Sequence, residues 1–86
     1  MKLAIGSLLM LLGITSVAQA ESCYDLWYER NAIYDAHGFC FKTQLGKETF
    51  DNSDCVTSNV RLTPAEQRRV DQIKSEEKRR HCKVNQ

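Results

Sequence analysis

The sequence predicts a small, mainly α-helical domain in which two antiparallel helices are joined by a disulfide-braced connecting loop, with at most a short β-hairpin. Three observations support this prediction. Two stretches begin with helix-capping patterns and continue with apolar residues at helical spacing. The stretch between them is rich in turn-forming residues. The 86 residues include four cysteines, an even number that in a small exported protein indicates two disulfides.

The first twenty residues have the pattern of a secretory signal peptide. Lys2 supplies a positive charge, residues 3–17 are mostly apolar, and residues 18–20 (Ala-Gln-Ala) are suited to cleavage. The apolar stretch has fewer than the roughly 18 apolar residues of a membrane-spanning helix. We therefore expect cleavage, no stable membrane span, and a mature part, residues 21–86, that forms a single domain outside the cytoplasm.

The mature part is electrically neutral, but its charges are unevenly distributed. Without Lys2, 11 basic residues stand against 11 acidic ones. Residues 21–60 contain seven acidic and three basic residues, whereas residues 61–86 contain four acidic and eight basic ones. Because a neutral chain is poorly suited to follow a nucleic-acid backbone, we expect no nucleic-acid partner.

The first helix is predicted over residues 23–37. Ser22 and Asp25 have the spacing of a capping box, and apolar residues recur after them at helical intervals. Gly38 stands where a glycine with positive φ commonly ends a helix. Residues 39–43 alternate enough to be extended.

Residues 44–59 are expected to form an irregular loop, because they combine a glycine with a run of Asp, Asn and Ser. The second helix is predicted over residues 64–81, since a threonine cap, a proline and a glutamate mark its start and its last turn is basic. Only Val70 and Ile73 are aliphatic in its middle, so this helix needs a partner. The first helix is expected to supply the apolar area through Leu26, Trp27, Ile33 and Tyr34.

Antiparallel packing favours one of the three possible cysteine pairings. Cys23 begins the first helix and Cys82 follows the second, so the two ends lie together. Cys40 and Cys55 bracket the loop. We therefore expect the disulfides Cys23–Cys82 and Cys40–Cys55, although spacing alone leaves the other pairings open.

In the first helix the pair Leu26-Trp27 is followed by Arg30-Asn31, by Ile33-Tyr34 and, at its end, by His37-Gly38. This pattern resembles the signature of the YARHG domain, a presumed extracellular bacterial module. The start of the second helix, residues 62–66 (Leu-Thr-Pro-Ala-Glu), also fits this signature, and the cysteines resemble those of a four-cysteine subgroup. Asp35 and Ala36 depart from the Ala-Arg of the naming motif. The resemblance implies an exported domain with no established reaction. The matching residues are Leu26, Trp27, Arg30, Asn31, Ile33, Tyr34, His37 and Gly38.

Arg30 and Asn31 lie in the middle of the first predicted helix, where Asn is unfavourable. One interpretation is that both hydrogen-bond the backbone of the connecting loop. The other is that Arg30 holds the carboxylate of a ligand. We favour the first, because buried polar groups are normally paired within the protein.

No set of residues forms a convincing active site, so we expect no enzymatic activity, no cofactor and no metal site. Asp35 and His37 are expected on different helix faces, and His37 is better explained as a hydrogen-bonded residue at the helix end. The cysteines lack the paired spacing of zinc sites. A minor hydrolase is kept only as a remote alternative.

The predicted function is that of a periplasmic or secreted, monomeric recognition module that binds an envelope protein or a cell-wall component. One candidate surface is the pair Tyr24 and Tyr28, which share one face of the first helix. The other candidate surface is the basic end formed by Arg79, Arg80 and Lys83.

The alternative prediction is a small periplasmic inhibitor or immunity-type protein that blocks a hydrolase with the loop of residues 44–54.

Overall fold

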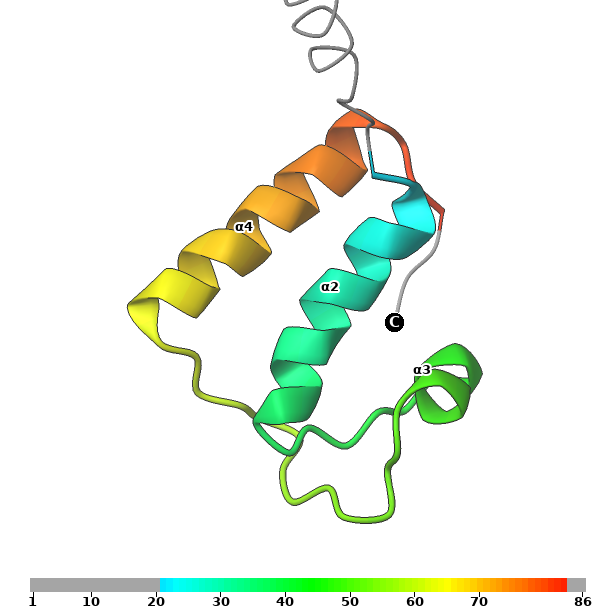
Figure 1. Cartoon of the computed structure of the whole chain (residues 1–86), viewed down its shortest axis with the longest axis vertical. Helices are drawn as coiled ribbons and strands as arrows, with labels where there is room; N and C mark the ends of the chain where they lie inside the picture. The colour runs from blue at the N-terminus through cyan, green and yellow to red at the C-terminus, as the bar shows by residue number, and fades with distance from the viewer. Residues whose placement is uncertain (1–20, 84–86) are drawn as a thin grey trace, which may run out of the picture.

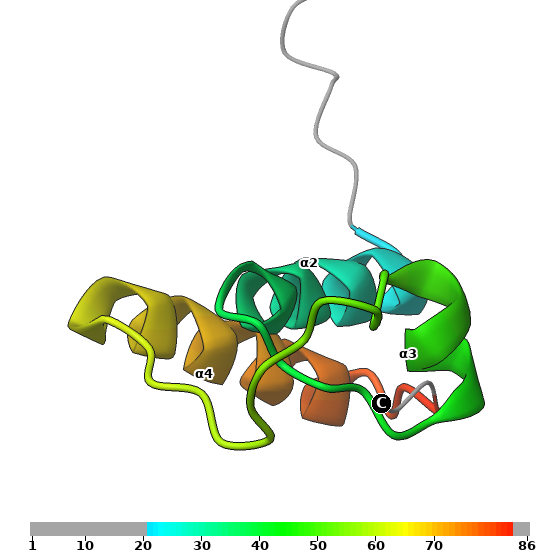
Figure 2. The same ribbon diagram turned by 90° about the horizontal axis from the view of Figure 1, so that it is seen from below.

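The computed structural model describes residues 21–83, so the predicted signal peptide lies outside the described residues, as do residues 84–86. Within the described part the chain is mainly helical (Figure 1). Its helices are α2 (Cys23–Ala36), α3 (Gln44–Thr49) and α4 (Pro64–Arg79). Helices α2 and α4 pack side by side in antiparallel directions, and α3 lies on the other side of α2 (Figures 1 and 2). None of these helices has the length and hydrophobicity of a membrane-spanning helix.

Helix α2 begins and ends with the residues that the sequence indicates. The Ser22 side chain accepts a hydrogen bond from the Asp25 backbone N–H at 3.0 Å, and the Asp25 carboxylate accepts one from Ser22 N–H. At the other end Gly38 has a φ of 80°. Its N–H and that of Phe39 donate to carbonyls of the last turn, which is the Schellman arrangement. The helix ends at Ala36, one residue earlier than predicted.

Helix α4 has the same two kinds of end. Thr63 caps its start, with the carboxylate of Glu66 completing the capping box. At its C-terminus His81 has a φ of 56°, a region that residues with a side chain rarely adopt. The N–H groups of His81 and Cys82 donate to carbonyls of the last turn. The helix ends at Arg79 rather than at residue 81, because this Schellman arrangement begins there.

The connecting segment, residues 37–63, is more ordered than predicted. Helix α3 replaces part of the expected irregular loop, and the Thr43 hydroxyl oxygen accepts a hydrogen bond from Gly46 N–H at its start. Residues 39–43, predicted to be extended, form no regular strand, and the short hairpin that the sequence allowed at most is not formed. The strand-like pairing within residues 21–83 is one parallel bridge between Phe39 and Thr57. The prediction was wrong here because a six-residue helix has too little periodicity to stand out from its turn-forming neighbours.

Two sets of apolar residues are buried on different sides of α2. Between the long helices these are Leu26, Val70 and Ile73. On the side of the connecting segment Trp27 packs in a cluster with Phe41 and Phe50. Ile33 and Tyr34, which were expected to supply much of the apolar area, are only partly buried.

Two disulfides, Cys23–Cys82 and Cys40–Cys55, close the structure, and this is the pairing expected from the sequence. The first joins the start of α2 to the residue after the last turn of α4. The second closes the part of the connecting segment that contains α3. Each region of the fold therefore has its own covalent link.

Candidate functional site

Arg30 is an internal ion-pair residue rather than a partner of the connecting loop. Its guanidinium donates two hydrogen bonds, both of 3.0 Å, to the carboxylate of Glu77 in α4. Arg30 is only 5% exposed. The expected bonding of Arg30 to the loop backbone was wrong, because its side chain points at α4. A forked pair of this kind satisfies both groups and leaves Arg30 little capacity for a ligand carboxylate.

Asn31 also bonds within the helices and not to the loop, so that expectation was wrong as well. It is fully buried, and its amide nitrogen donates to the Trp27 carbonyl, one turn earlier, at 2.9 Å. The loop backbone is instead satisfied by Asn52, whose amide bonds both N–H and C=O of Phe41, at 2.9 and 3.0 Å. Only the general abundance of Asn, Asp and Ser in this stretch indicated such a residue.

A second forked pair joins the long helices. Arg69 of α4 donates from two nitrogens to the carboxylate of Glu29, each at 2.6 Å. These hydrogen bonds lower the pKa of Glu29, against the opposing effect of burial, and the charge of Arg69 lowers it further. The pair lies nearer the surface than that of Arg30, with both side chains more than a third exposed. An exposed ion pair contributes little to the free energy of unfolding, so the main effect of this pair is to fix how α2 and α4 are aligned along their length.

His37 links the end of α2 to the start of α4, consistent with a hydrogen-bonded histidine at a helix end. Its Nε2 lies 2.8 Å from the Glu66 carboxylate. The same carboxylate oxygen accepts the Thr63 N–H at 2.9 Å. The backbone bond from Thr63, followed by the contact with His37, lowers the pKa of Glu66, although partial burial opposes this. The arrangement links the two helix ends through one carboxylate.

Tyr24 and Tyr28 form the aromatic surface that the sequence indicated. Each is 45% exposed, and their ring centroids are 6.2 Å apart. Both rings also pack against core residues. The centroid of the Tyr24 ring is 5.4 Å from that of Trp27, and the centroid of the Tyr28 ring is 5.2 Å from that of Phe50. The two rings are thus held in place while a large part of each faces solvent.

The ring contacts continue through the molecule and include all seven aromatic residues of the chain. From the exposed tyrosines they pass to Phe50, then to Phe41 and Phe39. The last contact is between Phe39, which follows α2, and Tyr34 in the last turn of that helix. The aromatic surface is therefore the exposed edge of the core that the connecting segment shares with α2.

The basic end is less free than the sequence indicated. Arg79 and Arg80 both hydrogen-bond the carboxylate of Glu76, and these bonds lower the pKa of Glu76. Arg80 also donates to the backbone carbonyl of Glu21. Lys83 is exposed. The signal missed in the sequence was the three- and four-residue spacing from Glu76 to the two arginines, which places them on one helix face.

The two candidate surfaces lie at the same end of the molecule. The Cys23–Cys82 disulfide holds the residues after α4 against the first turn of α2, and the bond from Arg80 to Glu21 adds to this contact. Figure 1 shows the segment after α4 crossing the start of α2. The structure therefore brings the tyrosine pair and the basic end into one region, which we call the disulfide end.

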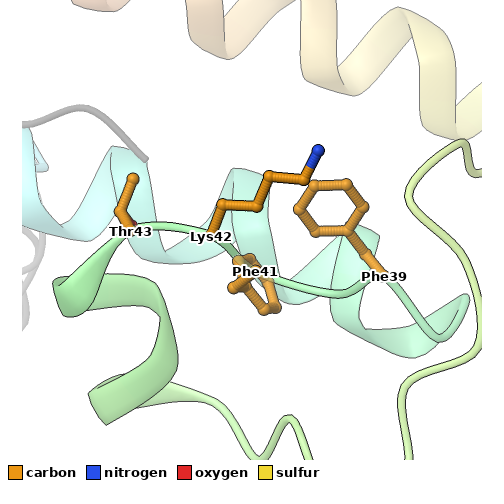
Figure 3. A pocket seen from close by; sticks show the side chains of 4 residues that line it. All are labelled: Phe39, Phe41, Lys42 and Thr43. Carbon is orange, nitrogen blue, oxygen red and sulfur yellow. The ribbon is translucent and has the colours of Figure 1, made fainter.

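A pocket that sequence analysis missed lies in the connecting segment (Figure 3). Its volume is about 200 Å³, and Phe39, Phe41, Lys42 and Thr43 line it. No periodicity or motif in the sequence indicated it. In the part of the chain that the structure describes, no group of three or more His, Cys, Asp or Glu residues is placed to hold a metal ion.

Comparison with known protein families gives a match over most of the chain. The family model of the YARHG domain matches residues 1–78, which include the whole of α2 and α3 and nearly all of α4. Neither the curated proteins nor the solved structures contain a match. The match includes His37 and Glu66, which link the end of α2 to the start of α4.

Proposed function

Since the chain belongs to the YARHG domain family, we propose that it is an exported, non-catalytic recognition module that binds a component of the bacterial envelope at the disulfide end. Two features support export. The first twenty residues have the pattern of a signal peptide. The four cysteines are joined in two disulfides, and such bonds persist in oxidising compartments.

The observation that carries the binding proposal is the tyrosine pair of Tyr24 and Tyr28. Binding surfaces favour tyrosine because a flat ring gives a large contact area for little loss of side-chain entropy. Here that loss is reduced further, since each ring already rests on Trp27 or Phe50. Two half-exposed rings that are held in place by packing against core residues form a surface suited to a sugar ring or to an apolar side chain of a partner.

The basic end determines the charge that such a partner should carry. Arg79 and Arg80 together exceed the single charge of Glu76, and Lys83 has no carboxylate partner among residues 21–83. The basic end itself therefore carries more positive than negative charge. We expect an anionic envelope component, such as a cell-wall glycan with carboxylates or an acidic patch of an envelope protein.

The test is binding of the exported protein to insoluble cell wall and to envelope extract. The protein is purified from cells that express the full chain, and it is then sedimented with peptidoglycan or cross-linked in the extract. The double variant Tyr24→Ala, Tyr28→Ala should lose at least about tenfold in affinity, because truncation of a central aromatic residue typically costs more than 1 kcal/mol. Lys83→Ala should lose less, and its loss should shrink as salt is raised.

The control variant is Val56→Ala. Val56 is 79% exposed and therefore also an exposed apolar residue. It lies beside Gly38, at the opposite end of α2 from the tyrosines. Binding that falls equally in Val56→Ala, or wild-type binding that does not exceed that of the tyrosine variant, would disprove the proposed surface.

The inhibitor alternative remains a prediction, and the same proteins test it. It assigned the contact with a hydrolase to residues 44–54, which form α3 and the turn after it. Phe50 in this stretch is only 7% exposed and packs on Trp27, so it is not available for insertion into an active site. Substitution of the exposed Leu45 and Lys47 would lower the potency of an inhibitor and leave binding at the disulfide end unchanged.

A further inference from the structure

The pocket of the connecting segment is separate from the disulfide end and has the size of a site for one apolar group. A cavity of about 150 Å³ binds benzene, and pockets for drug-sized ligands begin at about 300 Å³. The volume here, about 200 Å³, lies between these values. The pocket can therefore take a phenyl ring or a branched aliphatic side chain, but not a long acyl chain.

The apolar wall of the pocket is already in place. Phe41 is only 2% exposed. Its ring is stacked on that of Phe50, with ring centroids 4.8 Å apart, and is perpendicular to that of Phe39, with ring centroids 4.9 Å apart. The backbone of Gly46 supports Phe41 from α3, so closely that a Cβ on that glycine would lie 2.9 Å from the ring. An apolar group entering the pocket would not have to order these rings first, and this lowers the cost of binding.

The polar groups at the pocket are hydrogen-bond donors. Lys42 carries an ammonium group, which has donors and no acceptor. The Thr43 hydroxyl oxygen already accepts the Gly46 N–H, so its own proton is free to be donated. None of the four lining residues is acidic. Figure 3 shows the Lys42 side chain running beside the Phe39 ring, on the side of the backbone that faces α4.

Lys42 is also available for a ligand. It is exposed, and no carboxylate of residues 21–83 lies within salt-bridge distance of it. This differs from Arg30, Arg69, Arg79 and Arg80, each of which is paired within the protein. An unpaired ammonium beside an apolar pocket of this size complements a small anion with an apolar group attached.

We propose that this pocket binds a small carboxylate that carries one phenyl-sized apolar group, with the group against the side of the Phe39–Phe41 ring pair that lines the pocket and the carboxylate at Lys42 and Thr43. The free C-terminus of a peptide ending in an apolar residue and a free aromatic acid both have this chemistry. The site is independent of the tyrosine pair, so it can hold even if the disulfide end binds nothing.

The experiment is a titration of the exported protein followed by backbone amide NMR. The probes are N-acetylphenylalanine, its neutral amide, and phenylpropionate, which has the ring and the carboxylate without a peptide bond. N-acetylphenylalanine should shift the amide signals of residues 39–43 in a saturable way, with a dissociation constant of about 1 mM for a ligand of this size. The amide should bind about two- to fivefold more weakly, because an exposed ion pair contributes at most about 1 kcal/mol.

The variants assign the carboxylate contact. Lys42→Gln should bind the acid and the amide equally, whereas Lys47→Gln, an exposed lysine of α3, should keep the difference. Tighter binding of N-acetylphenylalanine than of phenylpropionate assigns peptide C-termini, and equal binding assigns free aromatic acids; either result supports the site.

Three results would overturn the proposal. The first is the absence of saturable shifts at residues 39–43 up to 10 mM ligand, about ten times the expected dissociation constant. The second is a preference for the acid that survives in Lys42→Gln. The third is that removal of residues 84–86 alone shifts the same signals, since the pocket would then be occupied by the chain itself.

Discussion

The two sides of α2 are stabilised by different chemistry. On the side of α4 the buried apolar residues are the aliphatic Leu26, Val70 and Ile73, and two forked Arg–Glu pairs join the helices. On the side of the connecting segment aromatic rings pack against Trp27, and the Asn52 amide satisfies the loop backbone. The helix pair thus combines aliphatic packing with complementary charge, whereas the connecting segment depends on ring packing.

This difference shows how a chain of this size can support two small half-cores. Neither half-core is large, and a domain of this length gains only about 3–5 kcal/mol from apolar burial. Each half-core therefore has its own disulfide, Cys23–Cys82 for the helix pair and Cys40–Cys55 for the connecting segment. Both surfaces proposed for binding, the tyrosine pair and the pocket, belong to the aromatic side.

The disulfides should give the largest effect and separate the two regions. Cys23 and Cys82 are 59 residues apart, and Cys40 and Cys55 are 15 apart. Because the entropy removed from the unfolded chain grows with loop length, Cys23→Ser, Cys82→Ser should cost about 4 kcal/mol and Cys40→Ser, Cys55→Ser about 3 kcal/mol. The measurement is urea unfolding without reductant. A variant lacking all four cysteines that is as stable as the wild type would disprove the dependence on disulfides.

Arg30→Ala should cost about 3 kcal/mol, because it leaves the Glu77 carboxylate unpaired in a largely buried position. The double variant Arg30→Met, Glu77→Leu should recover most of this loss, since it removes both charges. Lys74→Ala, at an exposed position of the same helix, should change the free energy of unfolding by less than about 0.5 kcal/mol. If Arg30→Ala were fully stable and lost only binding, Arg30 would be a ligand-binding residue instead.

Gly46→Ala tests the packing of the connecting segment and should cost about 2 kcal/mol. In an exposed helix the same change is favourable by up to about 1 kcal/mol. Here the added Cβ would lie 2.9 Å from the ring of Phe41, and that ring is held between its aromatic neighbours. Overpacking of this kind is destabilising. The control is Lys47→Ala in the same helix, and a stabilised Gly46→Ala variant would show that Phe41 can move.

His81→Gly should stabilise the helix pair by about 0.5–1 kcal/mol. His81 and Gly38 hold the same position after their helices, both with positive φ, but only glycine adopts that conformation without strain. Ser75→Gly, in the exposed interior of α4, should instead cost roughly 0.5 kcal/mol. Thermal unfolding measures both changes. A loss of stability in His81→Gly would mean that the imidazole contributes more than its backbone strain costs.

The sequence was sufficient for those parts of the fold that depend on neighbouring residues. The caps at Ser22 and Thr63 and the glycine at Gly38 fixed the helix ends to within two residues. The antiparallel arrangement then led to the cysteine pairing. Exposure of Tyr24 and Tyr28 also followed from their spacing.

The sequence was insufficient where the outcome depends on contacts between distant residues. Arg30 is 47 positions from Glu77, and several other carboxylates could have paired with it. The short helix α3 is stabilised by the approach of Gly46 to Phe41, which no local pattern encodes. For the same reason the pocket beside Phe41 could not be predicted.

Acid should weaken the helix pair more than the connecting segment, with the smallest effect of this series. The pKa values of Glu29, Glu66 and Glu76, all between or at the ends of the long helices, are lowered from 4.5, whereas in the connecting segment only that of Asp51 is lowered, by its bonds to Ser53. A carboxyl with a lowered pKa in the folded state adds stability above its unfolded pKa, and this is lost as pH falls through the folded value.

The urea midpoint of the wild type should therefore decline as pH is lowered from about 5 to 3, a range that begins just above the unfolded pKa of these carboxyls and extends below it. The triple variant Glu29→Gln, Glu66→Gln, Glu76→Gln cannot titrate at these positions and keeps the capping box, since glutamine also fits it. In the triple variant the urea midpoint should fall less steeply with decreasing pH than it does in Asp51→Asn. An equal slope in the two variants would mean that the ion pairs of the helices contribute no more than one turn of the connecting segment, and the contrast between the two sides of α2 would then rest on packing alone.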